Sequence, residues 1–277
     1  MSLSELLRAP AGAVSLDDID PGGKPGFDGD KAAGQHALGE ISAPLRELQT
    51  KLAADGYTGG TRSLLLVIQG MDTSGKGGVL KQCVGIFDPG GVRITSFKKP
   101  TPEELRHDFL WRVEKAVPGH GQIGIFDRSH YEDVLIGRVR ELAPAEEIER
   151  RYEAINEFEK RLADEGTTIV KCMLHISRDE QRQRLLDRLD DPTKQWKYKP
   201  ADVDERALWD DYQRAYEIAL TRCNTDDAPW YVVPSDRKWY RSFAIASLLR
   251  EALDAMGLRW PVPDYDVARE RERVSDS

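Results

Sequence analysis

Short apolar runs alternate with longer amphipathic segments through most of this chain, and that alternation limits the fold more than any other feature. The apolar runs have strand length and lie at residues 64–69, 92–97, 124–127, 168–176 and 230–233. Helical patterns occupy residues 43–54, 76–87, 102–117, 131–139, 144–165, 178–190, 203–223 and 239–255. Apolar strands that alternate with helices predict a parallel sheet covered on both faces. The fold class is therefore α/β with three layers.

Length and charge indicate one large domain without a polyanion-binding surface over its whole exterior. The 277 residues suit one α/β domain, residues 41–265, between an N-terminal arm at 1–40 and a charged tail at 266–277. The first 36 residues are rich in Gly, Asp and Pro, so we expect an extended or loosely packed leader. Forty basic against 48 acidic residues give a charge of −8, which disfavours nucleic acid as a partner.

Cellular location follows from the apolar content and the cysteines. No apolar run approaches the roughly 20 residues that a membrane helix needs, so no membrane partner is expected. The N-terminus lacks a basic start followed by an apolar segment, so it does not read as a signal peptide. Cys83, Cys172 and Cys223 are odd in number and far apart, which favours buried free thiols. A cytoplasmic location is therefore the expectation.

A glycine-rich turn carrying one lysine follows the first apolar strand. Gly70, Gly75 and Lys76 have the spacing of a phosphate-binding loop, in which backbone N–H groups converge on an anion. Gly77 occupies the position where the usual pattern has a Ser or Thr that binds magnesium. An acid, Asp72, lies inside the loop instead. The loop therefore predicts phosphate binding with Lys76 as the clamp, against the alternative of a surface lysine in a glycine turn.

Charged residues also follow the next two strands. Ligands of open parallel sheets bind beyond the carboxyl ends of the strands, where Lys98, Asp127 and Arg128 are expected to join the loop. Asp127 ends an apolar strand, which is typical of the acid that holds magnesium beside a phosphate loop; a helix N-cap is the alternative. Asp127 and Asp72 would then share the metal. For Arg128, contact with the transferring phosphate and a structural ion pair stay equally open.

Residues 178–199 form a locally basic element in this acidic chain, with seven basic and five acidic side chains. Helical spacing puts Arg178 with Arg182 and Arg184 with Arg188 on separate stripes. The first pair shares its stripe with leucines, and the second pair is placed to overhang the phosphate site. This pattern predicts a lid at about 178–202 that closes over phosphates; a solvated helix with ion pairs is the alternative.

The remaining candidates for chemistry favour packing. His107, His130 and His175 lack metal-ligand spacing and are expected to be structural. Tyr212 and Tyr216 belong to an aromatic cluster that could stack a nucleobase, but their helical spacing favours the core.

Three segments, taken together, resemble the polyphosphate kinase 2 family. They are the loop at residues 70–78, the segment Phe-Asp-Arg-Ser-His-Tyr-Glu-Asp-Val-Leu at 126–135 and the segment Asp-Pro-Thr-Lys-Gln-Trp-Lys at 191–197. The segment Ala-Pro-Trp-Tyr-Val-Val-Pro at 228–234 also fits, and the resemblance covers roughly residues 45–258. Motifs in this order over this length are far more specific than the glycine loop alone.

The resemblance implies a thymidylate-kinase-like P-loop kinase fold with a helical lid, Mg²⁺ dependence and a homodimer or homotetramer. It implies phosphoryl exchange between inorganic polyphosphate and AMP, ADP or ATP. Carried over by motif, Asp72 and Asp127 would bind magnesium, Lys76 and Arg128 would stabilise the transferring group, and lid arginines such as Arg188 would grip phosphates. The wording at 129–135 resembles class III, whose members accept both AMP and ADP, although many of these have Asn at the position of Asp127.

Two other functions use the same loop. An ATP-dependent kinase of a nucleoside monophosphate or other small acceptor would consume ATP without polyphosphate. A non-catalytic phosphate or nucleotide sensor would bind tightly without turnover, which the presence of Asp72, Asp127 and Lys76 disfavours.

Overall fold

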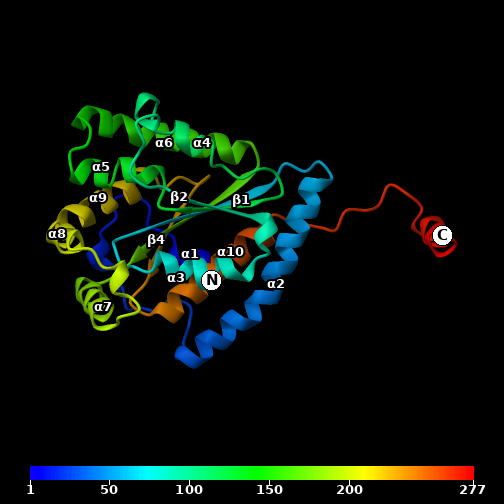
Figure 1. Cartoon of the computed structure of the whole chain (residues 1–277), viewed down its shortest axis with the longest axis horizontal. Helices are drawn as coiled ribbons and strands as arrows, with labels where there is room; N and C mark the ends of the chain where they lie inside the picture. The colour runs from blue at the N-terminus through cyan, green and yellow to red at the C-terminus, as the bar shows by residue number, and fades with distance from the viewer.

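The computed structural model describes all 277 residues and contains one five-stranded parallel sheet with helices on both faces (Figure 1). The strand order is β2-β3-β1-β4-β5. The strands are β1 (Ser63–Gly70), β2 (Val92–Ser96), β3 (Ile123–Asp127), β4 (Thr167–His175) and β5 (Trp230–Pro234). All five predicted strands are present within one residue of their expected ends. The predicted three-layer α/β fold is confirmed.

Alternate side chains of the central strands supply two separate cores. On one face Leu65, Val67 and Phe126 pack against α6 (Ala145–Asp164) and α9 (Trp209–Arg222). On the other face Leu64 and Leu66 pack against α2 (Lys31–Tyr57), α3 (Lys76–Gln82) and α10 (Lys238–Ala255). A period of two puts successive residues on opposite faces, so continuous apolar strands are expected only when both faces are covered.

Several predicted helices are shorter or divided. Residues 102–117 contain only a 3₁₀ turn, Glu104–Arg106, and the short helix α4 (Trp111–Glu114). The Asp108 carboxylate accepts from the backbone N–H of Leu110, which gives the chain an alternative to a continuous helix. Residues 131–139 form a 3₁₀ turn, His130–Asp133, and α5 (Ile136–Val139). Residues 203–223 divide at Leu208 into α8 (Ala201–Ala207) and α9.

The first 36 residues are more ordered than the sequence indicates. Helix α1 (Leu3–Leu7) buries Leu3 and Leu7 against α10 and β5, and Val14 and Leu16 are also buried. A second helix, α2, begins at Lys31, where the Asp30 carboxylate caps the Ala33 N–H. The expectation of a loosely packed leader is therefore wrong for these segments. Their scattered apolar residues have no regular period, because they fill gaps along an existing core.

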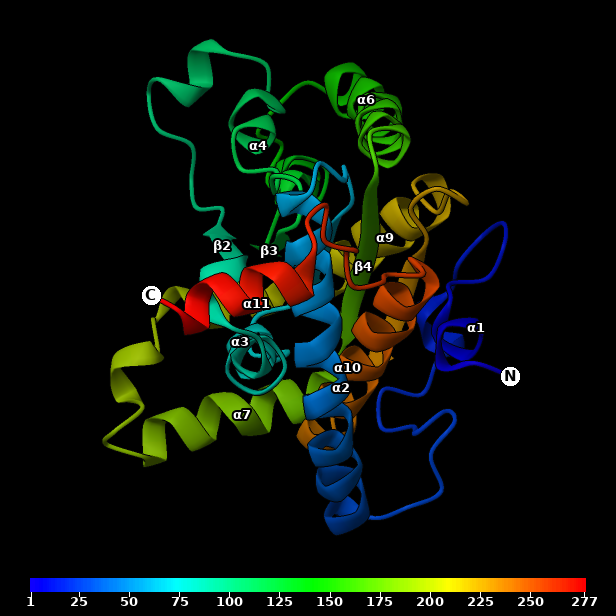
Figure 2. The same ribbon diagram turned by 90° about the vertical axis from the view of Figure 1, so that its right-hand side faces the viewer.

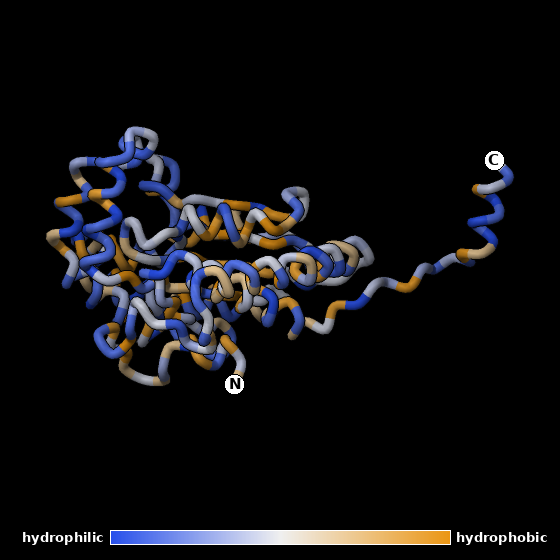
Figure 3. Tube along the Cα trace, turned by 90° about the horizontal axis from the view of Figure 1, so that it is seen from below, coloured by the Kyte–Doolittle hydropathy of each residue, from blue (hydrophilic) through white to orange (hydrophobic).

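The charged C-terminal segment forms helix α11 (Val267–Ser275), whose residues are exposed or partly exposed. Figure 1 and Figure 3 show this helix at the end of an extended segment that leaves the body after α10. Its tube in Figure 3 is mostly hydrophilic in colour. No helix of the protein is long and apolar enough to cross a membrane.

The parallel sheet brings the functional candidates to one edge. The carboxyl ends of β1 and β3 are adjacent, since Ile68 pairs with Asp127 in the ladder. The loop after β1 and the charged segment after β3 therefore begin side by side. Helix α7 (Arg178–Asp190), at its predicted bounds, follows β4 and projects from the same edge (Figure 2).

Candidate active site

The loop between β1 and α3 has a backbone shape that depends on glycine. Gly70 has φ +152° and Gly75 has φ +112°, which L side chains rarely adopt. Thr73, between them, has φ +61°, a conformation that a threonine holds only when its surroundings impose it. Arg184 of α7 (Arg178–Asp190) fixes this part of the loop. Its Nη1 donates to the carbonyl oxygens of Thr73, at 2.9 Å, and Ser74, at 3.0 Å. Helix α7, which carries Arg184, thus holds the loop in its shape.

Lys76, the first residue of α3, folds back over the loop. Its Nζ donates to the carbonyl oxygens of Gly70, at 2.7 Å, and Met71, at 3.3 Å. Burial lowers the pKa of Lys76, and Arg128 lowers it further, whereas Glu132, Asp72 and Asp127 oppose the shift. The ammonium therefore lies among three carboxylates and one guanidinium, at the meeting point of the loop and the segment after β3.

Asp72 and Asp127 reach this point from neighbouring strands. The Asp127 Oδ2 accepts from the Ser96 hydroxyl at 3.2 Å, and the Asp72 Oδ2 lies 3.4 Å from Arg188 Nη1. No group of three or more His, Cys, Asp or Glu residues is arranged to hold a metal by itself. Mg²⁺ usually binds one or two carboxylates and completes its shell with water and substrate oxygens, so this pair fits such an ion.

The segment after β3 has a second strained residue at the site. Arg128 has φ +64°, and its backbone N–H donates to the Ile68 carbonyl at 3.1 Å, which ties it to the end of β1. Its half-exposed side chain lies 3.9 Å from the Glu132 carboxylate. Burial raises the pKa of Glu132, more than Arg128 and Lys76 lower it. No sequence pattern singles out Glu132, because it is one acid among several in a segment that reads as an ordinary helix.

A buried charged cluster supports this segment from below. The Lys171 ammonium, fully buried in β4, donates to the Glu159 carboxylate at 2.5 Å, the Tyr131 hydroxyl at 2.8 Å and the Cys223 carbonyl at 2.7 Å. The other Glu159 oxygen accepts from Tyr131 at 2.9 Å and contacts His130 Nε2 at 3.1 Å. His130 is therefore structural, as predicted. The buried network fixes His130 and Tyr131, and with them the backbone between Arg128 and Glu132.

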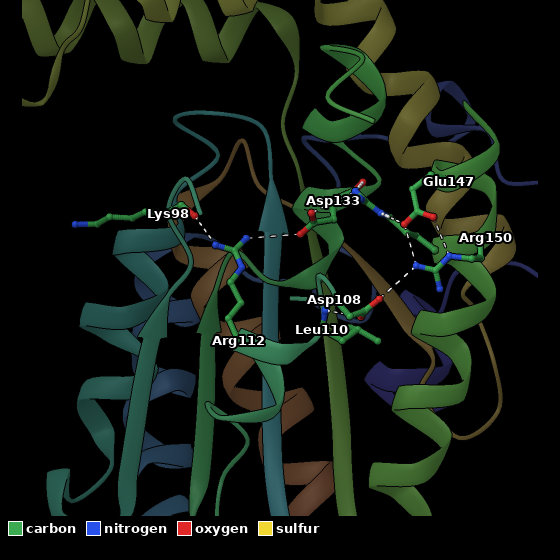
Figure 4. A network of polar contacts seen from close by, with 8 residues as sticks. Lys98, Asp108, Leu110, Arg112, Asp133, Glu147 and Arg150 are labelled. Atoms are coloured by element: carbon green, nitrogen blue, oxygen red, sulfur yellow. Dashed lines mark hydrogen bonds and ion pairs between the residues drawn. The ribbon is translucent and has the colours of Figure 1, made fainter. Parts of the chain in front are cut away.

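A second network joins the loop after β2 to the same segment (Figure 4). The Arg112 guanidinium donates to the Lys98 carbonyl at 2.8 Å and lies 3.6 Å from the Asp133 carboxylate. Arg151 contacts the other Asp133 oxygen at 3.3 Å. The Lys98 side chain extends away from this network in Figure 4 and lines neither hollow described below. The structure thus gives the Lys98 backbone a positioning role and does not bring its ammonium to the loop.

The four arginines of α7 divide differently from the predicted stripes. Arg188 lies at the site, between Asp72 and Asp202. Arg184 is buried, pairs with Glu180 and donates to four backbone carbonyls, so its guanidinium holds the loop. Arg182 is exposed and pairs with Asp179, and neither it nor Arg178 lines a hollow of the site.

Two hollows meet at the loop. The larger, here called the groove, has a volume of about 910 Å³ and is lined by 19 residues of which one is hydrophobic. Nine of these are basic and five are acidic. The basic residues are Lys76, Lys81, Arg128, Arg184, Arg188, Lys194, Lys197, Lys199 and Lys238. This groove is the strongly positive feature of a chain whose net charge is −8.

The smaller hollow, here called the pocket, has a volume of about 240 Å³. Its charges nearly balance, with Lys76, Arg128 and Arg206 against Asp72, Glu132, Asp202 and Glu205. Apolar and aromatic walls come from Met71, Leu135, Ile136, Tyr212 and Tyr216. Tyr216 is buried, as predicted for a core residue, but it also lines this pocket. Five residues line both the groove and the pocket: Asp72, Lys76, Arg128, Asp202 and Glu205. Lys76 and Arg128 therefore lie where the two hollows meet.

Comparison with known proteins narrows the chemistry. The model of the family described as polyphosphate kinase 2 matches residues 28–260. An AMP/ADP-polyphosphate phosphotransferase of Meiothermus ruber is 46% identical, over 92% of this chain and 94% of its own. An ADP-polyphosphate phosphotransferase of Rhodopseudomonas palustris is 40% identical, over 78% of each chain. A crystal structure of polyphosphate kinase 2 from Arthrobacter aurescens TC1 has 54% identity and a TM-score of 0.98, and covers all of this chain and 98% of its own.

Proposed function

The chain belongs to the polyphosphate kinase 2 family, and on that premise we propose that it transfers phosphoryl groups reversibly between inorganic polyphosphate and the nucleotides AMP and ADP. The forward reactions produce ADP and ATP. The observation that supports this most directly is the pair of hollows that meet at Lys76. A strongly basic groove suits a long polyanion, and an almost neutral pocket with tyrosine walls suits a nucleotide.

In the proposed reaction a terminal phosphate oxygen of the nucleotide attacks the terminal phosphorus of the polyphosphate chain. One P–O bond forms, the P–O bond to the next polyphosphate unit breaks, and the shortened chain leaves as an anion. The attacking oxygen is already anionic at neutral pH, so no general base is needed. Lys76 and Arg128 lie at the junction of the hollows and would neutralise charge on the transferring group.

Glu132 and Asp202 would help to align the cationic side chains with the substrate phosphates. Both line the pocket, and Glu132 faces Lys76 and Arg128. A carboxylate at this position would attract the Lys76 and Arg128 side chains and hold them in a fixed orientation toward the groove. Arg188 bridges Asp72 and Asp202 and would follow the phosphates when the lid closes.

Phosphotransferases of this family generally need a divalent metal. We assign Mg²⁺ to Asp72 and Asp127. Both carboxylates are close enough to the Lys76 ammonium to attract it and to raise the pKa of Lys76. When bound, the ion would neutralise charge on the substrate phosphates. Gly70, Gly75 and Gly77 would leave the loop backbone open to phosphate, as the sequence indicates.

Use of both AMP and ADP is supported by the Meiothermus ruber relative, whose name includes both nucleotides. The class III assignment stays a prediction with Asp127 as its departure. The same relatives do not favour an ATP-dependent kinase or a sensor.

The proposal also includes a homodimer or homotetramer in the cytoplasm. The three cysteines are free and buried, which agrees with a reducing compartment. Sedimentation of the purified chain measures the assembly.

The test is direct. Purified chain with MgCl₂, polyphosphate and either AMP or ADP should form ADP and ATP, resolved by ion-exchange chromatography. Lys76→Met should lower kcat by a factor on the order of 10² to 10³, the scale for losing an electrostatic stabiliser. Lys160→Met, which removes an exposed lysine paired with Asp164 on α6, is the matched control and should leave kcat unchanged. Product formation from ATP but never from polyphosphate would reject the proposal.

A further inference from the structure

A buried arginine lies directly behind the phosphate loop and has no acidic partner. Arg241, in the first turns of α10, is 3% exposed. Its side chain makes one hydrogen bond, from Nη1 to the Ser74 carbonyl at 3.2 Å, and its Nε has no partner. No carboxylate forms an ion pair with it. Arg184, which is also buried and donates to the same Ser74 carbonyl, differs because it pairs with Glu180 at 2.8 Å.

Two glycines of the loop make room for this side chain. A Cβ added to Gly75 would overlap the Arg241 guanidinium, and one added to Gly78 would lie 2.5 Å from Arg241 Nη2. A Cβ added to Gly77, between them, would meet nothing within 4 Å. Gly78 has no positive φ that would require glycine, so its small size is explained by the guanidinium beneath it. The loop and Arg241 therefore fit each other closely.

An unpaired buried cation costs folding free energy, because desolvation is not repaid by a counter-charge. The charged groups that act on Arg241 are cations, Arg184 on α7 and Lys238 at the start of its own helix, α10. Burial, reinforced by Arg184, lowers the pKa of Arg241 to about 10. Its hydrogen bond does not explain its presence, since the Ser74 carbonyl already accepts from Arg184 at 3.0 Å.

We propose that Arg241 is a positioning residue whose buried charge is compensated by phosphate bound on the opposite side of loop 70–78. The loop then binds polyanion more tightly at the expense of the stability of the ligand-free protein. This inference rests on the proposed function, because it requires the groove to hold a phosphate chain. It extends that function by adding a residue that lines neither hollow and touches no substrate.

Arg241→Met tests the inference, since methionine fills most of the space without charge. The dissociation constant for tripolyphosphate, measured by calorimetry without metal, should rise at least about tenfold, which is 1.4 kcal/mol. The melting temperature of the ligand-free variant should equal or exceed that of the parent. Arg241→Lys keeps a charge and should bind tripolyphosphate within about threefold of the parent. Arg250→Met, at an exposed arginine of α10 that pairs with Asp254, should change neither quantity.

The opposite signs of the two effects separate this role from a structural one. A variant Arg241→Met that unfolds or melts earlier, with an unchanged dissociation constant, would show that Arg241 only props the loop. A melting temperature that rises without loss of affinity would also overturn the inference. Failure of the parent protein to bind tripolyphosphate would instead reject the proposed function, whatever the variants do.

Discussion

At the scale of single residues, the loop lacks the hydroxyl of the usual phosphate-binding pattern and carries an acid instead. The usual hydroxyl position is Gly77, and a side chain there would meet no neighbouring atom within 4 Å. The absence of a hydroxyl is therefore not forced by crowding. Asp72 supplies a carboxylate from within the turn, and Asp127 supplies a second from the adjoining strand. In the proposed metal site, this exchange would keep an oxygen ligand beside Lys76 and would add negative charge.

Glu132 gives a prediction with a defined pH dependence. Its pKa is raised above the usual 4.5 by burial, so the ionised carboxylate destabilises the folded state above the folded pKa. Below 4.5 the group is protonated in both states and this cost vanishes. Glu132→Gln should therefore melt roughly 1–4 °C higher than the parent at pH 7, on the scale of about 1 kcal/mol. The difference should shrink to zero as the pH falls toward 4.5, in thermal scans followed by circular dichroism.

The same substitution should lower kcat, because Lys76 and Arg128 lose the acid that orients them. Glu157→Gln, at an exposed position of α6, serves as the control and should match the parent at every pH. A constant difference between pH 4.5 and 7 would contradict the assigned cause, since only a titrating group makes the difference depend on pH.

At the scale of elements, the strands and α7 are predictable because local pattern and tertiary environment agree. The central strands are apolar on both faces, and α7 is preceded by its N-cap Ser177, whose hydroxyl accepts from the Glu180 N–H. Segments that the sequence misassigns have competing local bonds or remote partners. Residues 102–117 are held by Arg112 and Asp108 rather than by a helical ladder. The first 36 residues become ordered because their apolar side chains pack against a core that the sheet and its helices build.

The lid gives a prediction at this scale. Gln181, Arg184 and Leu185 anchor the first half of α7, whereas Leu186 and Leu189 in its second half are 47% and 41% exposed. The segment that follows carries Trp196, 76% exposed in the groove, with Lys197 over its ring. We expect polyphosphate to close this half of the lid and to shift the tryptophan emission to shorter wavelength. Trp196→Phe should abolish most of the shift and raise the KM for polyphosphate a few-fold, roughly the loss of one exposed contact.

Trp260→Phe is the matched control, since Trp260 is 54% exposed on the C-terminal segment and lines neither hollow. It should keep the full shift. An emission change that survives in Trp196→Phe, or is absent in the parent during normal turnover, would mean that the lid does not move on binding.

At the scale of the whole molecule, the sequence predicts the centre of the site but not its walls. Lys76, Asp72, Asp127 and Arg128 follow strand ends, so the topology of a parallel sheet brings them together. The walls come from residues that are ordinary in their own segments, such as Lys238 on α10 and Arg206 on α8. Their convergence depends on how helices pack over the sheet edge. The sequence has no periodicity that reports this packing.

The distribution of charge over the molecule leads to the last prediction. The groove is strongly positive in a chain of net charge −8, and the pocket is nearly neutral. Salt screens attraction between a polyanion and a basic groove, and the loss grows with the number of phosphates contacted. The KM for long polyphosphate should therefore rise roughly ten- to a hundredfold between 50 and 200 mM NaCl, on the scale of about three to four phosphate contacts.

The KM for ADP provides the internal control and should change by less than about threefold over the same range, because few of its contacts are uncompensated charges. Tripolyphosphate should fall between the two, since it spans less of the groove. Initial rates at fixed free Mg²⁺ give all three values. Equal salt dependence for ADP and long polyphosphate would contradict the assignment of the donor to the groove, because the two hollows differ in charge and both adjoin the same lysine.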